Sequence, residues 1–310
     1  MKTIPSLSNL IVAVDPEGRA AQAVVRGYGL ARKMGLGIKL VMGVPVPTLL
    51  WSATTPKYLA DLHDGALERA RGRALPKLVA ALEEAQLDVD PSRDLEVLPG
   101  HPAKVLLQKA EEHQANLILI GGHQSRSGLD FGSTTRAIFS HAKVPIWIQA
   151  GPPKAIQKIL VPVDFSEHSE QAARHAQALA KIFGASVQAL HCFVAPDFAM
   201  PDHDASPGMP TYVIDQERQA NEEQLQAWLE SFPWDGVSCS ARFVEGDPQA
   251  SILEASEAHD LVVMGTHGRT GFARFLLGGV AYGVLKQAQT PILAIPNLEA
   301  SWLLENSAAL

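Results

Sequence analysis

The stretches Leu10-Ile-Val-Ala-Val-Asp15 and Ile159-Leu-Val-Pro-Val-Asp164 decide the fold, because each is an apolar strand that ends in aspartate and the second repeats the first. The two aspartates lie 149 residues apart in a chain of 310 residues. Four further pairs of segments follow in the same order: Leu30-Ala-Arg-Lys-Met-Gly35 with Leu179-Ala-Lys-Ile-Phe-Gly184, Gly100-His-Pro-Ala103 with Gly246-Asp-Pro-Gln249, Leu117-Ile-Leu-Ile-Gly-Gly-His123 with Leu261-Val-Val-Met-Gly-Thr-His267, and Val144-Pro-Ile-Trp-Ile148 with Thr290-Pro-Ile-Leu-Ala294. Five ordered pairs indicate a tandem duplication of one fold.

Each copy alternates apolar strands with helices. Beyond the first strand, the pattern predicts helices at 20–34, 59–85 and 103–113 and strands at 37–44, 117–120 and 144–148 in the first copy. In the second copy the helices are predicted at 169–183, 212–232 and 249–259, and the strands at 186–194, 261–264 and 290–295. A further strand, the third of each copy, leads to Gly100 in the first copy and to Gly246 in the second. The strands lack period-2 polarity, which is typical of a parallel sheet covered on both faces. With right-handed crossovers, the sequence predicts two tandem doubly wound α/β units, each an open, parallel five-stranded sheet.

The boundary between the copies is Gly151-Pro-Pro-Lys154, which can continue neither a helix nor a central strand. We therefore predict one domain at 1–150, a second at 154–298 and a C-terminal tail at 299–310. The chain length agrees, because roughly 150 residues per domain gives about two domains.

Composition excludes several classes of protein. The formal net charge of −7 excludes a generally basic nucleic-acid binder. The two cysteines cannot form a disulfide framework for a chain of this length. No apolar run approaches the roughly 20 residues of a membrane-spanning helix, and the N-terminus lacks the pattern of a signal peptide. We expect a soluble cytoplasmic protein without nucleic-acid or membrane partners.

A glycine-rich loop follows the fourth strand of the second copy, at a strand carboxyl end where doubly wound sheets bind ligands. Gly265 and Gly268 follow the strand, and Gly278-Gly279 opens a helix nine residues further on. Glycine lets a ligand approach the backbone, and a helix start offers free N–H groups and partial positive charge to phosphate. Arg269 and Arg274 add positive charge. On spacing alone, a nucleotide loop and a tight turn without a ligand both remain open.

The ordered combination Ile159-Leu-Val-Pro-Val-Asp-Phe-Ser-Glu167, Leu190-His191 and Gly265-x2-Gly268-x9-Gly278 resembles the universal stress protein family, and the duplication resembles its tandem members. The resemblance covers residues 9–148 and 157–296. It implies an adenine-nucleotide alpha hydrolase-like fold that binds ATP or AMP in the C-terminal half, with magnesium brought in by the phosphates. It also implies a regulatory or protective role in stress rather than catalysis.

The resemblance also assigns the site residues. Asp164 and the backbone near Cys192 would border adenine. Gly265, His267 and Gly268 would lie along the ribose and the α-phosphate. Gly278, Gly279 and Val280 would face the outer phosphates. Four further residues complete the predicted site: Pro162, Val163, Met264 and Arg269.

Both copies depart from the family's ATP motif. In the second copy, Gly279 stands at the motif's Ser/Thr position and Ala281 at a second hydroxyl position. Each lost hydrogen bond nets about 0.5–1.5 kcal/mol, which weakens binding by about one or two orders of magnitude. In the first copy Ser133 and Thr135 keep the hydroxyls, but Gln124 replaces the second glycine and the loop is two residues shorter. We predict a degenerate first site and at most one working, weakened site.

Other polar residues have simpler interpretations. Asp15 fits a carboxylate at a helix start, whereas for Asp164 this interpretation and an adenine-edge role both remain open. For His123 and His267, a loop-stabilising hydrogen bond is favoured over a catalytic base. The last set matches no metal-binding spacing, so no protein metal site is predicted: His191, Cys192, Asp202, His203, Asp204 and Cys239.

Three functional hypotheses follow. The first is the non-catalytic nucleotide-binding stress protein, and the second is an interaction module of the same fold that binds no nucleotide. The third, an ATP hydrolase or nucleotidyl transferase, is disfavoured because the chain has neither a HIGH-type motif nor a P-loop Gly-Lys-Ser/Thr. For assembly, the resemblance implies that the fifth strands pair within the chain as a pseudo-dimer, and a homodimer remains open.

Overall fold

The computed structural model describes residues 9–46, 57–122, 133–195, 211–267 and 277–296. The first half contains β1 (Asn9–Ala13), α1 (Ala21–Met34), β2 (Gly37–Val44), α2 (Lys57–Glu84), β3 (Leu95–Pro99), α3 (Pro102–Glu112), β4 (Leu117–Gly121), α4 (Ser133–His141) and β5 (Ile146–Gln149). The second half contains β6 (Lys158–Pro162), α5 (Glu167–Phe183), β7 (Ser186–Phe193), α6 (Thr211–Ser231), β8 (Cys239–Glu245), α7 (Pro248–Ser256), β9 (Leu261–Gly265), α8 (Gly279–Gln287) and β10 (Ile292–Ile295).

The strands of each half form a parallel five-stranded unit of doubly wound order. The order is β3-β2-β1-β4-β5 in the first half, and β8-β7-β6-β9-β10 repeats it in the second. This confirms the predicted fold class. The long first helix of each half ends at a glycine in the left-handed conformation, Gly35 at φ 66° and Gly184 at φ 69°, which is a common way to stop a helix.

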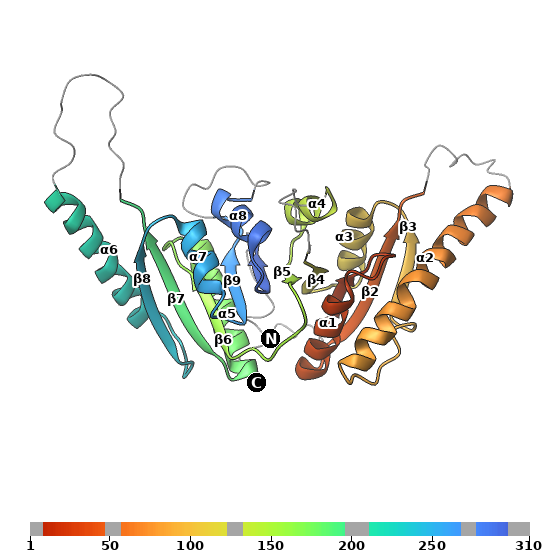
Figure 1. Cartoon of the computed structure of the whole chain (residues 1–310), viewed down its shortest axis with the longest axis horizontal. Helices are drawn as coiled ribbons and strands as arrows, with labels where there is room; N and C mark the ends of the chain where they lie inside the picture. Colours follow the sequence, from red (N-terminus) through yellow and green to blue (C-terminus); the bar gives the residue numbers. More distant parts are fainter. Residues whose placement is uncertain (1–8, 47–56, 123–132, 196–210, 268–276, 297–310) are drawn as a thin grey trace, which may run out of the picture.

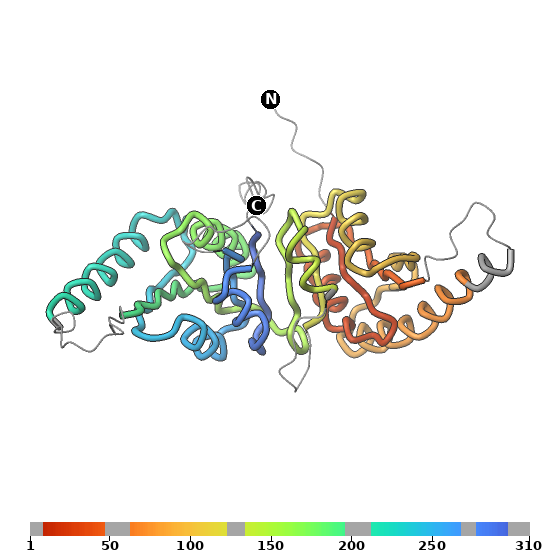
Figure 2. The backbone as a smooth tube through the Cα atoms, turned by 90° about the horizontal axis from the view of Figure 1, so that it is seen from above, coloured from red at the N-terminus to blue at the C-terminus, as the bar shows by residue number. Residues whose placement is uncertain are grey.

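The two units join into one sheet through their fifth strands. Strand β5 pairs antiparallel with β10 at the centre of the molecule (Figure 1). Ile148 lies opposite Ile292, and Trp147 lies opposite Leu293. Figure 2 shows the two halves side by side with these strands between them. The layout fits the intrachain pseudo-dimer expected from the fifth strands.

A hydrophobic core covers each face of the joined sheet, and each core draws residues from both halves. Helices α1, α2, α5 and α6 belong to the core on one face, and α3, α4, α7 and α8 to the core on the other. Trp147 of β5 is fully buried in the first of these cores. The halves are therefore packed together and share both hydrophobic layers.

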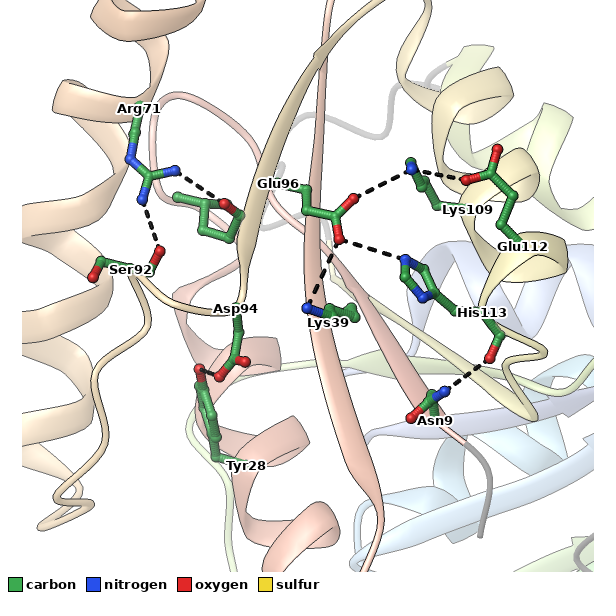
Figure 3. A network of polar contacts seen from close by, with 11 residues as sticks. Asn9, Tyr28, Lys39, Arg71, Ser92, Asp94, Glu96, Lys109, Glu112 and His113 are labelled. Carbon is green, nitrogen blue, oxygen red and sulfur yellow. Dashed lines mark hydrogen bonds and ion pairs between the residues drawn. The ribbon is translucent and has the colours of Figure 1, made fainter. Parts of the chain in front are cut away.

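Polar contacts fasten the edge strand β3 to its neighbours (Figure 3). Arg71 of α2 donates hydrogen bonds to the carbonyls of Ser92 and Leu95, at 2.7 and 3.0 Å. Glu96 forms ion pairs with Lys39 of β2 and Lys109 of α3, at 3.8 and 3.4 Å. These contacts hold the edge strand β3 against α2, β2 and α3.

A few element bounds differ from the prediction. The fifth strands begin at Ile146 and Ile292, one residue after Pro145 and Pro291, because proline has no N–H to donate to the ladder. Helix α7 ends at Ser256 rather than at residue 259, since the next amides bond carbonyls three residues back. In the part of the chain that the structure describes, every helix is too short or too polar to cross a membrane.

Candidate functional site

A cavity of about 280 Å³ opens at the carboxyl edge of the second half. The strand order reverses between β6 and β9, and ligands of doubly wound sheets bind at such a point. Ten of the twelve predicted site residues line this cavity: Pro162, Val163, Asp164, Cys192, Met264, Gly265, His267, Gly278, Gly279 and Val280. The other two, Gly268 and Arg269, lie outside the described residues.

Asp164 braces the turn between β6 and α5. Its Oδ1 accepts hydrogen bonds from the backbone N–H and the hydroxyl of Ser166, at 3.1 and 2.5 Å, and Ser166 in turn caps α5 by accepting from the N–H of Ser169. Asp164 also lines the cavity, so both interpretations of this residue have support. In the first half, Asp15 accepts from the amides of Glu17 and Ala20, both at 3.0 Å, which fits the helix-start interpretation.

His191 lines the cavity, although the sequence placed it only in the family motif Leu190-His191 and in a metal set, and not among the predicted site residues. It is 5% exposed, and its Nδ1 lies 2.7 Å from the carbonyl oxygen of Val163, which can only accept. Its ring lies 4.4 Å from that of Phe165, whose φ of 63° is unusual for a bulky residue. The histidine thus ties the carboxyl end of β7 to that of β6. Its position beside Cys192 at a strand end was the available signal in the sequence.

Gly265 and His267 shape the end of β9. A Cβ on Gly265 would come within 3.1 Å of the carbonyl oxygen of His168, so a larger residue would push β9 away from α5. The Nδ1 of His267 lies 3.0 Å from the hydroxyl of Thr266, which fits the loop-stabilising hydrogen bond that was favoured over a catalytic base.

The start of α8 forms the far wall of the cavity. The N–H of Gly278 donates to the carbonyl of Thr266 at 2.9 Å, so this amide is already used. Gly279, Val280 and Ala281 supply the next N–H groups, which have no partners within a helix. The helix has neither a side-chain cap nor an acidic residue in its first turn. Its positive end therefore faces the cavity without compensation from the helix's own side chains.

The remaining wall is apolar. Leu190, Ile252 and Met264 line it, and all three are buried. Burial raises the pKa of the Cys192 thiol to about 11, which keeps it protonated at neutral pH. Cys192 is therefore part of the wall and not an activated nucleophile. Sequence reasoning missed five further lining residues: Ser169, Leu190, His191, Pro248 and Ile252.

A metal site has no support among the described residues, because no three His, Cys, Asp or Glu side chains lie close enough together to hold an ion. Cys192 and Cys239 are free thiols. Asp202, His203 and Asp204 lie outside the described residues.

The corresponding region of the first half differs. A Cβ on Gly122 would lie 3.0 Å from the carbonyl oxygen of Gln149, so the end of β4 packs closely on β5. Thr135, one of the retained hydroxyl residues, is only 7% exposed in α4. His123 and Gln124 lie outside the described residues, as does the Ser133 side chain.

Comparison with known proteins gives a consistent result. The model of the Universal stress protein family matches the chain twice, at residues 7–149 and 155–296. A universal stress protein of Mycolicibacterium smegmatis is 29% identical over 300 residues, which cover 92% of this chain and 96% of that protein. One from Methanocaldococcus jannaschii is 35% identical over 141 residues, covering 45% of this chain and 81% of that protein.

Among solved structures, a universal stress protein of Archaeoglobus fulgidus superposes with a TM-score of 0.60. It covers 94% of this chain and 97% of its own, at 17% sequence identity. At this identity the likeness concerns the fold.

Proposed function

The chain belongs to the universal stress protein family, and from this premise we propose that its second half binds an adenine nucleotide, ATP or AMP, in a regulatory or protective role without catalysis. One observation carries the proposal: ten predicted residues from separate strands and helices line a single cavity at the switch point of the second half. We also propose the domain division 1–150 and 154–298, with 299–310 as a tail.

The cavity suits the base and the ribose. Its volume of about 280 Å³ is near the lower end of the roughly 300–1,000 Å³ typical of small-molecule pockets. The apolar wall of Leu190, Ile252 and Met264 offers a surface for a flat ring. Val163 and Cys192, near the carboxyl ends of β6 and β7, line the cavity beside this wall.

The phosphates belong at the start of α8. The N–H groups of Gly279, Val280 and Ala281 and the positive end of the helix suit anionic oxygens. Magnesium would be held chiefly by phosphate oxygens and water, as is usual for nucleotide-bound magnesium.

The titratable groups of the cavity support a binding role. Asp164 accepts from Ser166, and His191 is held by a backbone carbonyl. The Cys192 thiol is protonated at neutral pH, because burial raises its pKa. A nucleophilic mechanism needs a nucleophile beside an oriented base, and these lining residues do not form such a pair.

The second candidate function is an interaction module that binds no nucleotide. Gly279 and Ala281 favour it, because the cavity wall lacks a hydroxyl at both positions. Calorimetric titration with ATP and magnesium, and separately with AMP, distinguishes the two functions.

The decisive variant is Gly279→Asp. Aspartate in the first turn of a helix stabilises it, while its charge repels phosphate, so a loss of binding without a loss of stability points to the site itself. Ser133→Asp places the same charge at the start of α4 in the first half and is the matched control. We expect one ATP per chain, at least ~10-fold weaker binding for Gly279→Asp and no change for Ser133→Asp. Absence of binding heat at millimolar ATP would refute the proposal.

A further inference from the structure

A second cavity, of about 730 Å³, lies at the seam between the two halves. The first half contributes Arg26 of α1 and part of the linker after β5, including Lys154. The second half contributes the carboxyl ends of α7 and α8 and the residues before β9 and β10. This seam cavity shares no lining residue with the nucleotide cavity, which lies at the other ends of α7, α8 and β9.

Arg26 is a buried cation with neutral partners. It is 9% exposed, its Nε donates to Gln149 Oε1 at 3.2 Å, and its Nη2 donates to the carbonyl of Lys154 at 2.8 Å. These bonds use two of the five N–H groups of a guanidinium. Among the residues that the structure describes, no carboxylate comes within ion-pair distance of it. A buried charge without a counter-ion in contact is costly, so the site gains from a bound carboxylate.

The charge of Arg26 persists at neutral pH. Burial lowers its pKa to about 10, and the carboxylate of Asp260 opposes this from a distance. The guanidinium carbon lies 5.5 Å from the ring centre of Trp147, which holds the group against β5. Its planar fork is matched to a carboxylate, which can accept two parallel hydrogen bonds.

The opposite wall has the opposite polarity. Helices α7 and α8 both end at this cavity, and helix carboxyl ends attract cations. The carboxyl groups of Glu257 and Asp260 add negative charge. Asp260 accepts the amides of Gln157 and Lys158 through Oδ2, each at 2.9 Å, so its position is fixed.

A cation on one wall and anions on the other select a ligand that carries both charges. A dianion would be repelled by Glu257 and Asp260, and a diamine by Arg26 and Lys154. We propose that the seam cavity binds a free α-amino acid, with its carboxylate on Arg26 and its ammonium group toward Glu257 and Asp260.

The buried arginine and its glutamine partner occur in the first copy only. The counterpart of Arg26 in the second copy is His175, 149 residues later, which is 1% exposed. Burial lowers its pKa to about 4, so it is neutral near pH 7. The counterpart of Gln149, the last residue of β5, is the apolar Ile295, the last residue of β10. The duplicated core tolerates a neutral group here, so packing alone does not require the charge of Arg26.

The test is thermal unfolding of the full chain in the presence of the common L-amino acids, each at ~10 mM, followed by calorimetry on any that raise Tm. For each such amino acid, the corresponding amine lacks the carboxylate and the N-acetyl derivative lacks the ammonium charge. We expect the amino acid to raise Tm and both derivatives to have no effect. Absence of a shift with every amino acid, or an equal shift with the amine, overturns the proposal.

Variants at exposed positions keep the test independent of folding. Ala258→Trp fills the cavity and Glu257→Gln removes one negative charge, and both positions are exposed. Glu254→Gln in α7 removes a charge that does not line the cavity and is the matched control. We expect the first two to reduce affinity at least ~10-fold and the control to bind as the unaltered chain does. Unchanged binding by Ala258→Trp would place the ligand elsewhere. Gly279→Asp should leave amino-acid binding intact, which separates this site from the nucleotide site.

Discussion

Replacing Gly279 by serine should strengthen ATP binding. Gly279 is the first residue of α8 and lines the proposed nucleotide cavity. A Cβ built at this position meets no atom of the described residues within 4 Å, so the serine side chain fits without displacing any of them. Its hydroxyl would join the free N–H groups of the first helical turn beside the proposed phosphates.

The magnitude follows from one added hydrogen bond to a charged group. Such bonds contribute about 1.5–3 kcal/mol, and the open position of residue 279 argues for the lower end. Since about 1.4 kcal/mol is a factor of ten, we expect the Kd for ATP to fall roughly tenfold. Serine is also a better helix former than glycine by a few tenths of a kcal/mol, so Tm without ligand should rise slightly.

Calorimetric titration of the variant with ATP and magnesium measures the effect, and Gly279→Ala is the control. Alanine gives the same or greater gain in helix propensity but has no hydroxyl, so it separates the two contributions. If serine and alanine bind ATP equally, the reasoning about phosphate placement is wrong. A gain for AMP as large as for ATP would also contradict it, because residue 279 was assigned to the outer phosphates.

Three further predictions concern other parts of the chain. The folded-state pKa of His175 is about 4 against an ordinary 6.5, so the unfolded chain binds the proton more tightly. The free energy of unfolding should therefore fall by about 3 kcal/mol between pH 6.5 and pH 4, and urea titrations of His175→Met should show a flatter profile. Trp147→Ala should cost about 3–5 kcal/mol, because the ring is fully buried at the seam; a loss below 1 kcal/mol in urea unfolding would mean that the halves are not packed on one another. Burial raises the pKa values of Cys192 and Cys239 to about 11 and about 12, so both thiols should react slowly with iodoacetamide at pH 8, and ATP should protect only Cys192; equal protection of both would contradict the site.

The fold was predictable because the repeat supplied the same pattern twice. Strand ends were marked by Asp164 and Gly265, and parallel strands bring such ends to one edge. Residues near these strand ends could therefore be predicted to line one cavity, and the resemblance assigned them to parts of a nucleotide. The joining of the two sheets was expected only from the resemblance, since the short apolar strands β5 and β10 carry no signal in the sequence for their mutual antiparallel register.

Other features depended on contacts that no local pattern reveals. His191 reaches the carbonyl of Val163 because β6 and β7 pair with Pro162 opposite Leu190, and this register is a property of the folded sheet. The use of the Gly278 amide by Thr266 likewise arises only when the loop closes. In the sequence Arg26 is one polar residue in a helix, and its contacts with Trp147, Gln149 and Lys154 arise only when α1 packs against β5 and the residues that follow it.

The first half, which lacks an intact glycine motif, supports the structure of the second half. Alone, the second half would expose the edge of β10, whose four residues are all buried in the joined sheet, and exposed apolar edges promote aggregation. It would also lose the part of each core that the first half supplies, including Trp147 opposite Leu293. The first half therefore stabilises the second half whether or not it binds a nucleotide itself. At the seam the two halves differ in their buried side chains: the first half has Arg26 with its Gln149 partner, whereas the second half has His175 and Ile295 at the corresponding positions.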